Sequence, residues 1–255
     1  TNPDLIRFAV CWLPGPAAFS PYLNIEMAMS VGAGVDDLLK HPGLGKDVAI
    51  CRVRDPNQAH LMAGYAVHEV VHVERGFAQM QQNQARAEWA PPAIRPPRDL
   101  KVAVLGHGSM GACVVQALAA SGFSISVACR RDPSDPVEGV RYFTGNDSVL
   151  QSVAGQDVVI NVLPLTTETE DVLNTDLFSK MARGGWLIQI GRGEHLVEDD
   201  LVAALDSGQL AGATLDVFRT EPLPSDHPFW TDPRLRITPH IASDTTPHIV
   251  AEQAL

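Results

Sequence analysis

Three polar residues in the second half of the sequence, Arg192, Glu221 and His240, could together bind an anion and move a proton. An arginine can clamp a carboxylate and polarise a neighbouring carbonyl group. A histidine exchanges a proton near neutral pH, and a glutamate beside it fixes its tautomer and stabilises its cation. Each residue lies at or just past the end of an apolar segment: GGWLIQIG, GATLDVF and RLRITPH, respectively. We therefore expect a catalytic site in which Arg192 and His240 contact the substrate and Glu221 supports His240.

A second group of residues has the spacing of a phosphate-binding turn. The segment from Gly106 to Gly111 reads GHGSMG, follows the apolar run KVAVL and opens a helical pattern. Gly106 would permit the tight turn, Gly108 would let the backbone approach a diphosphate, and Gly111 would let the helix pack on the strand. The diphosphate would lie on the helix N-terminus, at Ser109 and Met110. A glycine-rich turn without a ligand is the alternative, but the flanking strand and helix favour dinucleotide binding.

The type of dinucleotide is indicated by the residues after the next apolar run, SISVAC. An acidic residue at this place would bind the ribose 2′-hydroxyl of NAD, but the sequence has Arg130 and Arg131. Arginine side chains can bind a 2′-phosphate, which a carboxylate would repel. The pair therefore favours NADP, and a solvated sheet rim is the alternative.

A competing motif occurs in the first half of the sequence. His68, Glu69 and His72 form HEVVH, the pattern in which two histidines bind zinc and a glutamate activates water. The extended form of the motif fails, since Arg75 stands where a glycine is required and Ala78 where a third histidine is required. We expect no metal site here, only a helix whose two histidines have ordinary partners, and keep a zinc hydrolase as an alternative.

The elements that must position these residues alternate regularly after residue 100. The apolar runs predict strands at 101–106, 124–129, 157–163, 184–190, 212–218 and 234–240. Helical patterns lie between them, at 110–121 and in the segments SVLQSVAG, TDLFSKMARGG and EDDLVAALDSG. Apolar strands that alternate with helices predict a parallel sheet covered on both faces. This is the pattern of a doubly wound α/β dinucleotide-binding domain, the Rossmann type.

The first hundred residues show a less regular pattern. FAVCWLP and residues 27–31 predict short strands, GAGVDDLLK predicts a glycine-rich turn that opens a helix, and residues 61–77 predict a partly buried helix leading to a connector. The connector is WAPPAIRPPRD, residues 89–99, where the prolines exclude a helix. We therefore predict a boundary between two α/β domains at this segment.

Composition excludes several classes of function. The 255 residues carry 30 acidic and 19 basic side chains, a net charge of -11, which disfavours nucleic acid as a partner. No apolar run is long enough to cross a membrane, and no secretory signal is visible. The four cysteines are widely spaced, without a CxxC pair, which favours a reducing cytoplasm over a disulfide framework or a zinc knuckle.

Together with the turn at Gly106, the segments LPLTTET, IGRG, LDVFRTEPLP and TPHIAS resemble those of the D-isomer-specific 2-hydroxyacid dehydrogenases. GAGVDDLL, the arginine pair and VEDDLVAALDSGQLAGATLDVFRTEPLP look most like the glyoxylate/hydroxypyruvate reductase branch of that family. The resemblance runs from about Trp12 to the C-terminus. It implies NADPH-dependent reduction of a small 2-oxoacid, with Arg192, Glu221 and His240 as the catalytic residues, in a homodimer.

The resemblance also implies further contacts. The cofactor would contact Leu163 and Pro164 at its adenosine, Asp216 at its nicotinamide amide, and Ile190, Gly191 and Ser243. The substrate carboxylate would lie on the backbone of Gly32, Ala33, Gly34 and Val35, with Trp12 near the substrate mouth.

The implied domains are a flavodoxin-like α/β substrate domain at 1–95, the dinucleotide-binding domain at 96–241, and the start of a segment returning to the substrate domain at 242–255. Family members have a further strand and helix before Trp12 and a longer helix after His240, so the resemblance implies that the substrate domain is truncated here. A cofactor-binding sensor without catalysis is the remaining alternative. It would not need Arg192, Glu221 and His240 together.

Overall fold

The computed structural model describes residues 2–254, which form two compact units. The smaller unit comprises residues 2–58 and 244–254, and the larger unit comprises residues 59–243. The proline-rich connector, where the sequence pattern places the domain boundary, therefore lies inside the larger unit.

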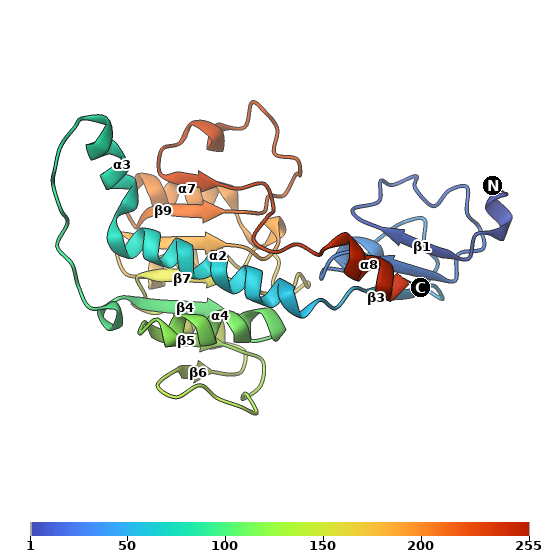
Figure 1. Ribbon diagram of the computed structural model, residues 1–255, viewed down its shortest axis with the longest axis horizontal. Helices are drawn as coiled ribbons and strands as arrows, with labels where there is room; N and C mark the ends of the chain where they lie inside the picture. The colour runs from blue at the N-terminus through green and yellow to red at the C-terminus, as the bar shows by residue number, and fades with distance from the viewer. Residues whose placement is uncertain (1, 255) are drawn as a thin grey trace. The chain divides into compact units, whose positions relative to one another are not determined.

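The larger unit is built on a fully parallel sheet, which we call the larger sheet (Figure 1). Its strand order is β10-β9-β8-β7-β4-β5-β6, so the order reverses between β4 and β7, the kind of switch point where doubly wound sheets bind ligands. The strands are β4 (Lys101–Leu105), β5 (Ser124–Ala128), β6 (Arg141–Phe143), β7 (Val158–Asn161), β8 (Gly185–Gln189), β9 (Leu210–Leu215) and β10 (Leu235–Ile237).

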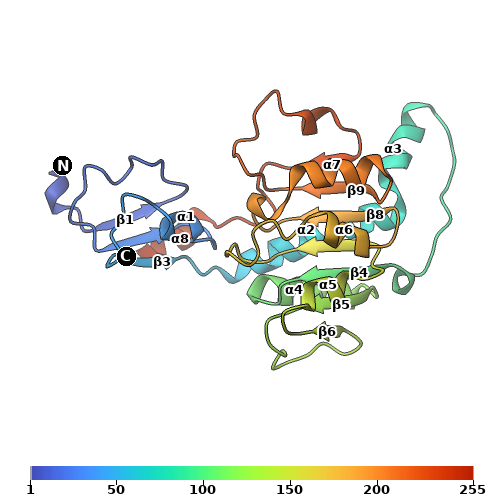
Figure 2. The same ribbon diagram turned by 180° about the vertical axis from the view of Figure 1, so that it is seen from behind.

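Helices cover both faces of the larger sheet. The long helix α2 (Pro56–Arg75) and α4 (Ser109–Ala120) pack on one face, seen in Figure 1. Helices α5 (Ser148–Val153), α6 (Thr175–Lys180) and α7 (Glu198–Asp206) pack on the other face, seen in Figure 2. Each face of the larger sheet carries a hydrophobic core, and successive side chains of β4 pack into these two cores alternately. Val102 packs into one core and Ala103 into the other. Both faces are apolar because both are covered, which explains the continuous apolar runs in the sequence.

The smaller unit has its own parallel sheet, in the order β1-β2-β3. Its elements are the 3-10 helix η1 (Pro3–Leu5), β1 (Phe8–Cys11), β2 (Met27–Ser30), α1 (Asp36–Leu39), β3 (Ala49–Arg52) and α8 (Pro247–Ala254). Phe19, Ala28 and Leu38 form its core. Gln253 of α8 accepts a hydrogen bond from the backbone N–H of Arg54 and donates one to its carbonyl, each 2.9 Å long. These two bonds hold the C-terminal helix in this unit.

Several predicted elements differ from the structure. The helix expected at 61–77 begins earlier, at Pro56, and ends at Arg75. Gly76, with a φ of 63°, separates it from a second helix, α3 (Phe77–Ala85). Helix α3, not α2, therefore leads to the connector. The last strands stop before the predicted site residues, since β9 ends at Leu215 and β10 at Ile237.

The 3-10 helices η2 (Pro97–Asp99), η3 (Gly193–His195) and η4 (Pro228–Thr231) complete the larger unit. None of the helices formed by residues 2–254 combines the length and the apolar character needed to cross a membrane.

Candidate active site

The predicted site residues of the larger unit gather at one edge of its sheet. They follow the carboxyl ends of successive strands, where parallel strands place their ligands. In spatial order these are Arg130 and Arg131 after β5, Gly106 after β4, Leu163 and Pro164 after β7, Ile190, Gly191 and Arg192 after β8, Asp216 after β9, and His240 and Ser243 after β10.

The structure pairs Glu221 with His240, as the sequence predicts. Glu221 Oε2 lies 2.7 Å from His240 Nδ1, and each side chain is 24% exposed. The other oxygen, Oε1, accepts a hydrogen bond of 2.9 Å from the backbone N–H of Phe218. Burial alone would raise the pKa of Glu221, but the bonds from His240 and Phe218 and the charge of Arg192 lower it on balance. The carboxylate is therefore ionised and lies against Nδ1 of the His240 ring.

A buried carboxylate, Asp216, holds the loop that carries His240. His240 has a φ of 54°, in the left-handed region, and its N–H donates to the Asp216 carbonyl at 2.8 Å. The Asp216 carboxylate accepts 2.8 Å bonds from the N–H groups of Ile241 and Ala242, and a 2.5 Å bond from the Thr238 hydroxyl. The resemblance implied only a nicotinamide contact for Asp216, and that contact stays a prediction. The structure gives this residue a second role, in shaping the loop.

A buried polar network supports the Arg192 loop. Asn161, Gln189 and His195 are all fully buried. Asn161 Nδ2 donates to Gln189 Oε1 at 2.8 Å and lies 2.9 Å from His195 Nδ1, while the Arg192 N–H donates to the same His195 nitrogen at 3.1 Å. Because Nδ1 accepts both bonds, the ring carries its proton on Nε2, which faces the Pro164 carbonyl at 3.3 Å. The sequence pattern did not indicate this network, which joins the loops after β7 and β8.

The glycines beside Arg192 are required for this close packing. A Cβ atom on Gly191 would lie 2.9 Å from both Asn161 Nδ2 and His195 Nδ1, and one on Gly193 would overlap the backbone of Phe218. The segment GRG therefore lets the backbone lie against the network while the Arg192 side chain remains partly exposed.

The turn from Gly106 to Gly111 has the geometry that a diphosphate requires. Gly106 has a φ of 105°, which an L side chain rarely adopts, and a Cβ atom on Gly111 would overlap the Gly106 carbonyl. A Cβ atom on Gly108 would meet open space, so the chain leaves the mouth of the turn clear. No described side chain caps the N-terminus of α4, where free N–H groups favour an anion. These residues fit a dinucleotide, and Arg130 and Arg131 are exposed after the next strand.

The predicted substrate loop lies in the smaller unit, between β2 and α1. The Trp12 ring packs directly on Gly32, where a Cβ atom would overlap it. Arg52 Nη1 donates a 2.8 Å bond to the Ala33 carbonyl, and Gly34 and Val35 complete the turn into α1. The structure thus brings Trp12 and residues 32–35 together within this unit.

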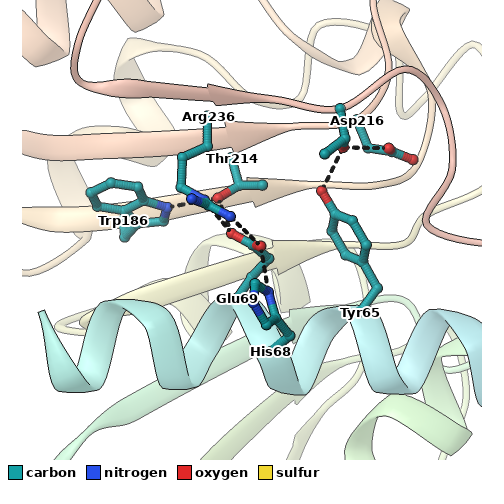
Figure 3. Close-up of polar contacts among 8 residues, drawn as sticks. Tyr65, His68, Glu69, Trp186, Thr214, Asp216 and Arg236 are labelled. Carbon is teal, nitrogen blue, oxygen red and sulfur yellow. Dashed lines mark hydrogen bonds and ion pairs between the residues drawn. The ribbon is translucent and has the colours of Figure 1, made fainter. Parts of the chain in front are cut away.

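The HEVVH motif joins a helix to the sheet (Figure 3). Glu69 is 1% exposed and accepts hydrogen bonds from Thr214 at 2.7 Å and from Arg236 at 3.0 and 3.1 Å. His68 Nδ1 also lies 2.8 Å from Glu69. A carboxylate held by these donors is poorly placed to activate a water molecule, so the motif is a structural anchor.

The expectation that both histidines of the motif have ordinary partners is wrong for His72. This residue is buried, and its Nε2 has no hydrogen-bond partner within the described part of the chain. Burial is the main cause that lowers the pKa of His72, so the ring is neutral at neutral pH. The ring packs against Phe77.

Comparison with known proteins agrees with this geometry. The family model for the NAD binding domain of D-isomer specific 2-hydroxyacid dehydrogenases matches residues 67–242. A glyoxylate/hydroxypyruvate reductase A from Serratia proteamaculans is 40% identical over 251 residues, which cover 96% of this chain and 80% of that protein.

Solved structures give the same result. A D-isomer specific 2-hydroxyacid dehydrogenase from Xanthobacter autotrophicus, in complex with NADPH and MES, is 34% identical with a TM-score of 0.89 over 99% of this chain and 79% of that chain. An NADPH-dependent glyoxylate/hydroxypyruvate reductase from Sinorhizobium meliloti, in complex with NADP and sulfate, is 31% identical with a TM-score of 0.89 over 98% of this chain and 79% of that chain. With its ion-paired Glu221 and His240, its Arg192 loop and its dinucleotide turn at one sheet edge, the chain belongs to the D-isomer specific 2-hydroxyacid dehydrogenase family.

Proposed function

We propose that this protein catalyses the NADPH-dependent reduction of glyoxylate and hydroxypyruvate to the corresponding 2-hydroxyacids. The observation that carries the proposal is the 2.7 Å pair of Glu221 and His240 at the sheet edge that also holds Arg192 and the dinucleotide turn. The names of the relatives from Serratia and Sinorhizobium support the substrate class, and the second of these also supports the cofactor.

The chain's residues divide the reaction between binding and proton transfer. The Arg192 guanidinium binds the substrate carboxylate and polarises the 2-oxo group, since its fork can contact two oxygens at once. When bound, NADPH would supply a hydride to C2 of the substrate. Protonated His240 gives its Nε2 proton to the oxygen that becomes the hydroxyl group, and Glu221 stabilises the imidazolium until then.

A panel of assays tests this function. NADPH consumption is measured with glyoxylate, hydroxypyruvate, pyruvate and no substrate, and each is repeated with NADH. We expect turnover with the first two acids and preference for NADPH. Tight NADPH binding without turnover on any acid would instead support a cofactor sensor, and zinc-dependent peptide hydrolysis without NADPH consumption would support a hydrolase.

The cofactor preference depends on Arg130 and Arg131. Replacing both with glutamine should raise KM for NADPH by about tenfold or more while leaving KM for NADH almost unchanged, because only NADPH carries the 2′-phosphate. Arg183→Gln, whose guanidinium binds the backbone of Ser207 at the opposite end of β8, is the matched control. Equal losses with both cofactors would show that the pair does not bind the 2′-phosphate.

We also propose that the enzyme is a homodimer. The segment from α3 through the connector exposes three large apolar side chains, Phe77, Trp89 and Ile94, and Trp89 is 97% exposed. Such a group is more typical of a contact surface than of a solvated loop. Analytical ultracentrifugation should show a dimer for the wild-type chain and a monomer for the double variant Trp89→Ser and Ile94→Ser.

The cytoplasm is the proposed compartment. The cysteines Cys11, Cys51, Cys113 and Cys129 are all free thiols, which is typical of a reducing environment. Fractionation of the source cells, with a disulfide-containing periplasmic protein as the marker, tests this location.

A further inference from the structure

A tyrosine on helix α2 contacts the loop that carries His240. The Tyr65 hydroxyl lies 2.6 Å from Thr238 Oγ1, although 173 residues separate the two in the sequence. Figure 3 shows the tyrosine ring rising from the helix toward the strand ends, where Asp216 also lies. Neither the sequence pattern nor the proposed mechanism uses this residue.

The direction of each hydrogen bond follows from the number of hydrogens available. The Thr238 hydroxyl has one hydrogen and donates it to Asp216 Oδ1 at 2.5 Å. Tyr65 must therefore donate to Thr238. The same Asp216 carboxylate accepts the N–H groups of Ile241 and Ala242, so a continuous chain of bonds joins the Tyr65 hydroxyl to the backbone directly after His240.

Tyr65 can donate this bond throughout the working pH range. Burial is the first cause that raises the pKa of Tyr65 above its ordinary value of 10, and the charges of Asp216 and Glu69 act in the same direction. The phenol is therefore protonated at neutral and moderately alkaline pH. Its role cannot be that of a proton donor to the substrate, because its one hydrogen is committed to Thr238.

The helix that presents Tyr65 is fixed against the sheet one turn farther on. Glu69, four residues after Tyr65 and on the same helix face, binds Arg236 of β10 and Thr214 of β9. Because Arg236 and Thr238 are two residues apart in the same chain segment, the helix is tied to this segment at two points. The position of the Tyr65 hydroxyl relative to the loop is thus well defined.

We propose that Tyr65 is a positioning residue, which holds the loop of residues 238–242 so that His240 keeps its ion pair with Glu221 and its aim at the substrate carbonyl. The proposal rests on the proposed function for its catalytic consequence. His240 has a left-handed backbone conformation, which persists only where its surroundings impose it. Loss of the Tyr65 bond frees the Thr238 hydroxyl to rotate away from Asp216 and loosens this restraint.

The variant Tyr65→Phe tests the proposal, since it keeps the ring and removes one hydroxyl. We expect kcat for glyoxylate reduction to fall by about tenfold, because small displacements of a proton donor are costly, while KM for NADPH changes by less than about twofold. Hydrogen exchange of the amides of Ile241 and Ala242 should become faster. Tyr142→Phe is the matched control, because it also removes one hydroxyl, which accepts a hydrogen bond from the N–H of Val137. This variant should change neither kcat nor the exchange of the Ile241 and Ala242 amides.

Variants of Thr238 separate positioning from general damage. Thr238→Ser keeps the hydroxyl and should retain most of kcat. Thr238→Val should lower kcat at least as much as Tyr65→Phe does. The double variant of Tyr65→Phe and Thr238→Val should be no slower than Thr238→Val alone, since both changes break one chain of bonds. If Tyr65→Phe does not fold, the comparison of Thr238→Ser with Thr238→Val decides.

Two outcomes overturn the proposal. The first is a Tyr65→Phe enzyme with the wild-type kcat and unchanged amide exchange at Ile241 and Ala242. The second is equal loss in Thr238→Ser and Thr238→Val. A wild-type protein that turned over no 2-oxoacid would contradict the proposed function. The exchange measurement needs no substrate, so faster exchange in Tyr65→Phe would still support the positioning role.

Discussion

The Glu221 carboxylate lies 2.7 Å from His240 and carries its charge in the working pH range. The pKa of Glu221 is lowered from its ordinary value of 4.5, so the carboxylate is ionised at every pH above that value and is lost as a counter-charge only when the pH falls below it. Within the working range, Glu221 therefore favours the imidazolium form that reduction needs.

Replacing this charge should narrow the pH range of reduction and widen that of oxidation. In Glu221→Gln, the alkaline limb of kcat/KM for reduction should move to lower pH, since the imidazolium loses its counter-charge and gives up its proton sooner. Oxidation of the 2-hydroxyacid needs neutral His240, so its acid limb should also move to lower pH. Asp232→Asn, which removes the charge of a partly buried carboxylate paired with Arg234 before β10, is the control. A uniform fall in rate with unmoved limbs would leave Glu221 as a structural residue only.

Arg192 contributes a planar fork and not merely a charge. Arg192→Lys keeps the charge but cannot contact the carboxylate and the carbonyl oxygen in the same way, so kcat/KM for glyoxylate should fall by about a hundredfold. Steady-state kinetics at saturating NADPH measure the loss. Because the backbone contacts of Arg192 with Gln189 and His195 are kept in this variant, the fold should remain intact. Wild-type kcat/KM in this variant would refute the assigned role.

At the residue scale, the sequence indicated the reactive groups better than their supports. Glu221 and His240 follow separate strands, and their types and positions were sufficient to predict the pair that the structure shows. The supporting contacts of Asp216, His195 and Tyr65 were not predicted. They depend on side-chain hydrogen bonds between residues as far as 173 positions apart, which leave no periodic signal in the sequence.

Glu69 anchors helix α2 to the larger sheet through Thr214 and Arg236. Burial alone would raise the pKa of Glu69, but hydrogen bonds from Arg236 and Thr214 outweigh this and lower it from 4.5. A lowered carboxylate pKa stabilises the folded state at pH values above 4.5, and this contribution is lost as the pH falls through the lowered value.

Glu69→Gln should therefore destabilise the protein near neutral pH. Removing one partner of a buried pair is costly, but Arg236 is partly exposed, so we expect a loss of about 1 to 3 kcal/mol in the free energy of unfolding. Urea unfolding at pH 7 measures it, and the difference from wild type should shrink below pH 4.5. Glu88→Gln, in an exposed pair with Arg86, should change stability by less than about 0.5 kcal/mol. An equal effect of both substitutions would contradict the anchor.

At the element scale, the strands of the larger sheet were predictable because their burial on both faces gives continuous apolar runs. The elements that were missed are short or partly exposed, such as β3, β6 and α8. The predicted end of β9 was too late, because Val217 and Phe218 continue the apolar run. The strand itself ends at Leu215, and Asp216 already binds the loop that carries His240.

For the whole molecule, a net charge of -11 is compatible with two anionic ligands. The field at the sheet edge is set locally by Arg192, by Arg130 and Arg131, and by the N-terminus of α4. The α/β class and the parallel sheet of the larger unit follow from the sequence pattern, whereas the parallel pairing of β1, β2 and β3 was not predicted. The extent of each unit does not, since α2 precedes the connector in sequence but packs most of its length on the larger sheet.

Direct hydride transfer is the central claim of this account, and isotope transfer from the cofactor tests it most directly. The enzyme is incubated with glyoxylate and NADPH that carries deuterium at both C4 positions of the nicotinamide, and the glycolate formed is analysed by mass spectrometry and NMR. We predict one deuterium at C2 of each product molecule, at a rate that Arg192→Lys greatly reduces. Glycolate without deuterium, or no glycolate with NADPH bound, would contradict the account.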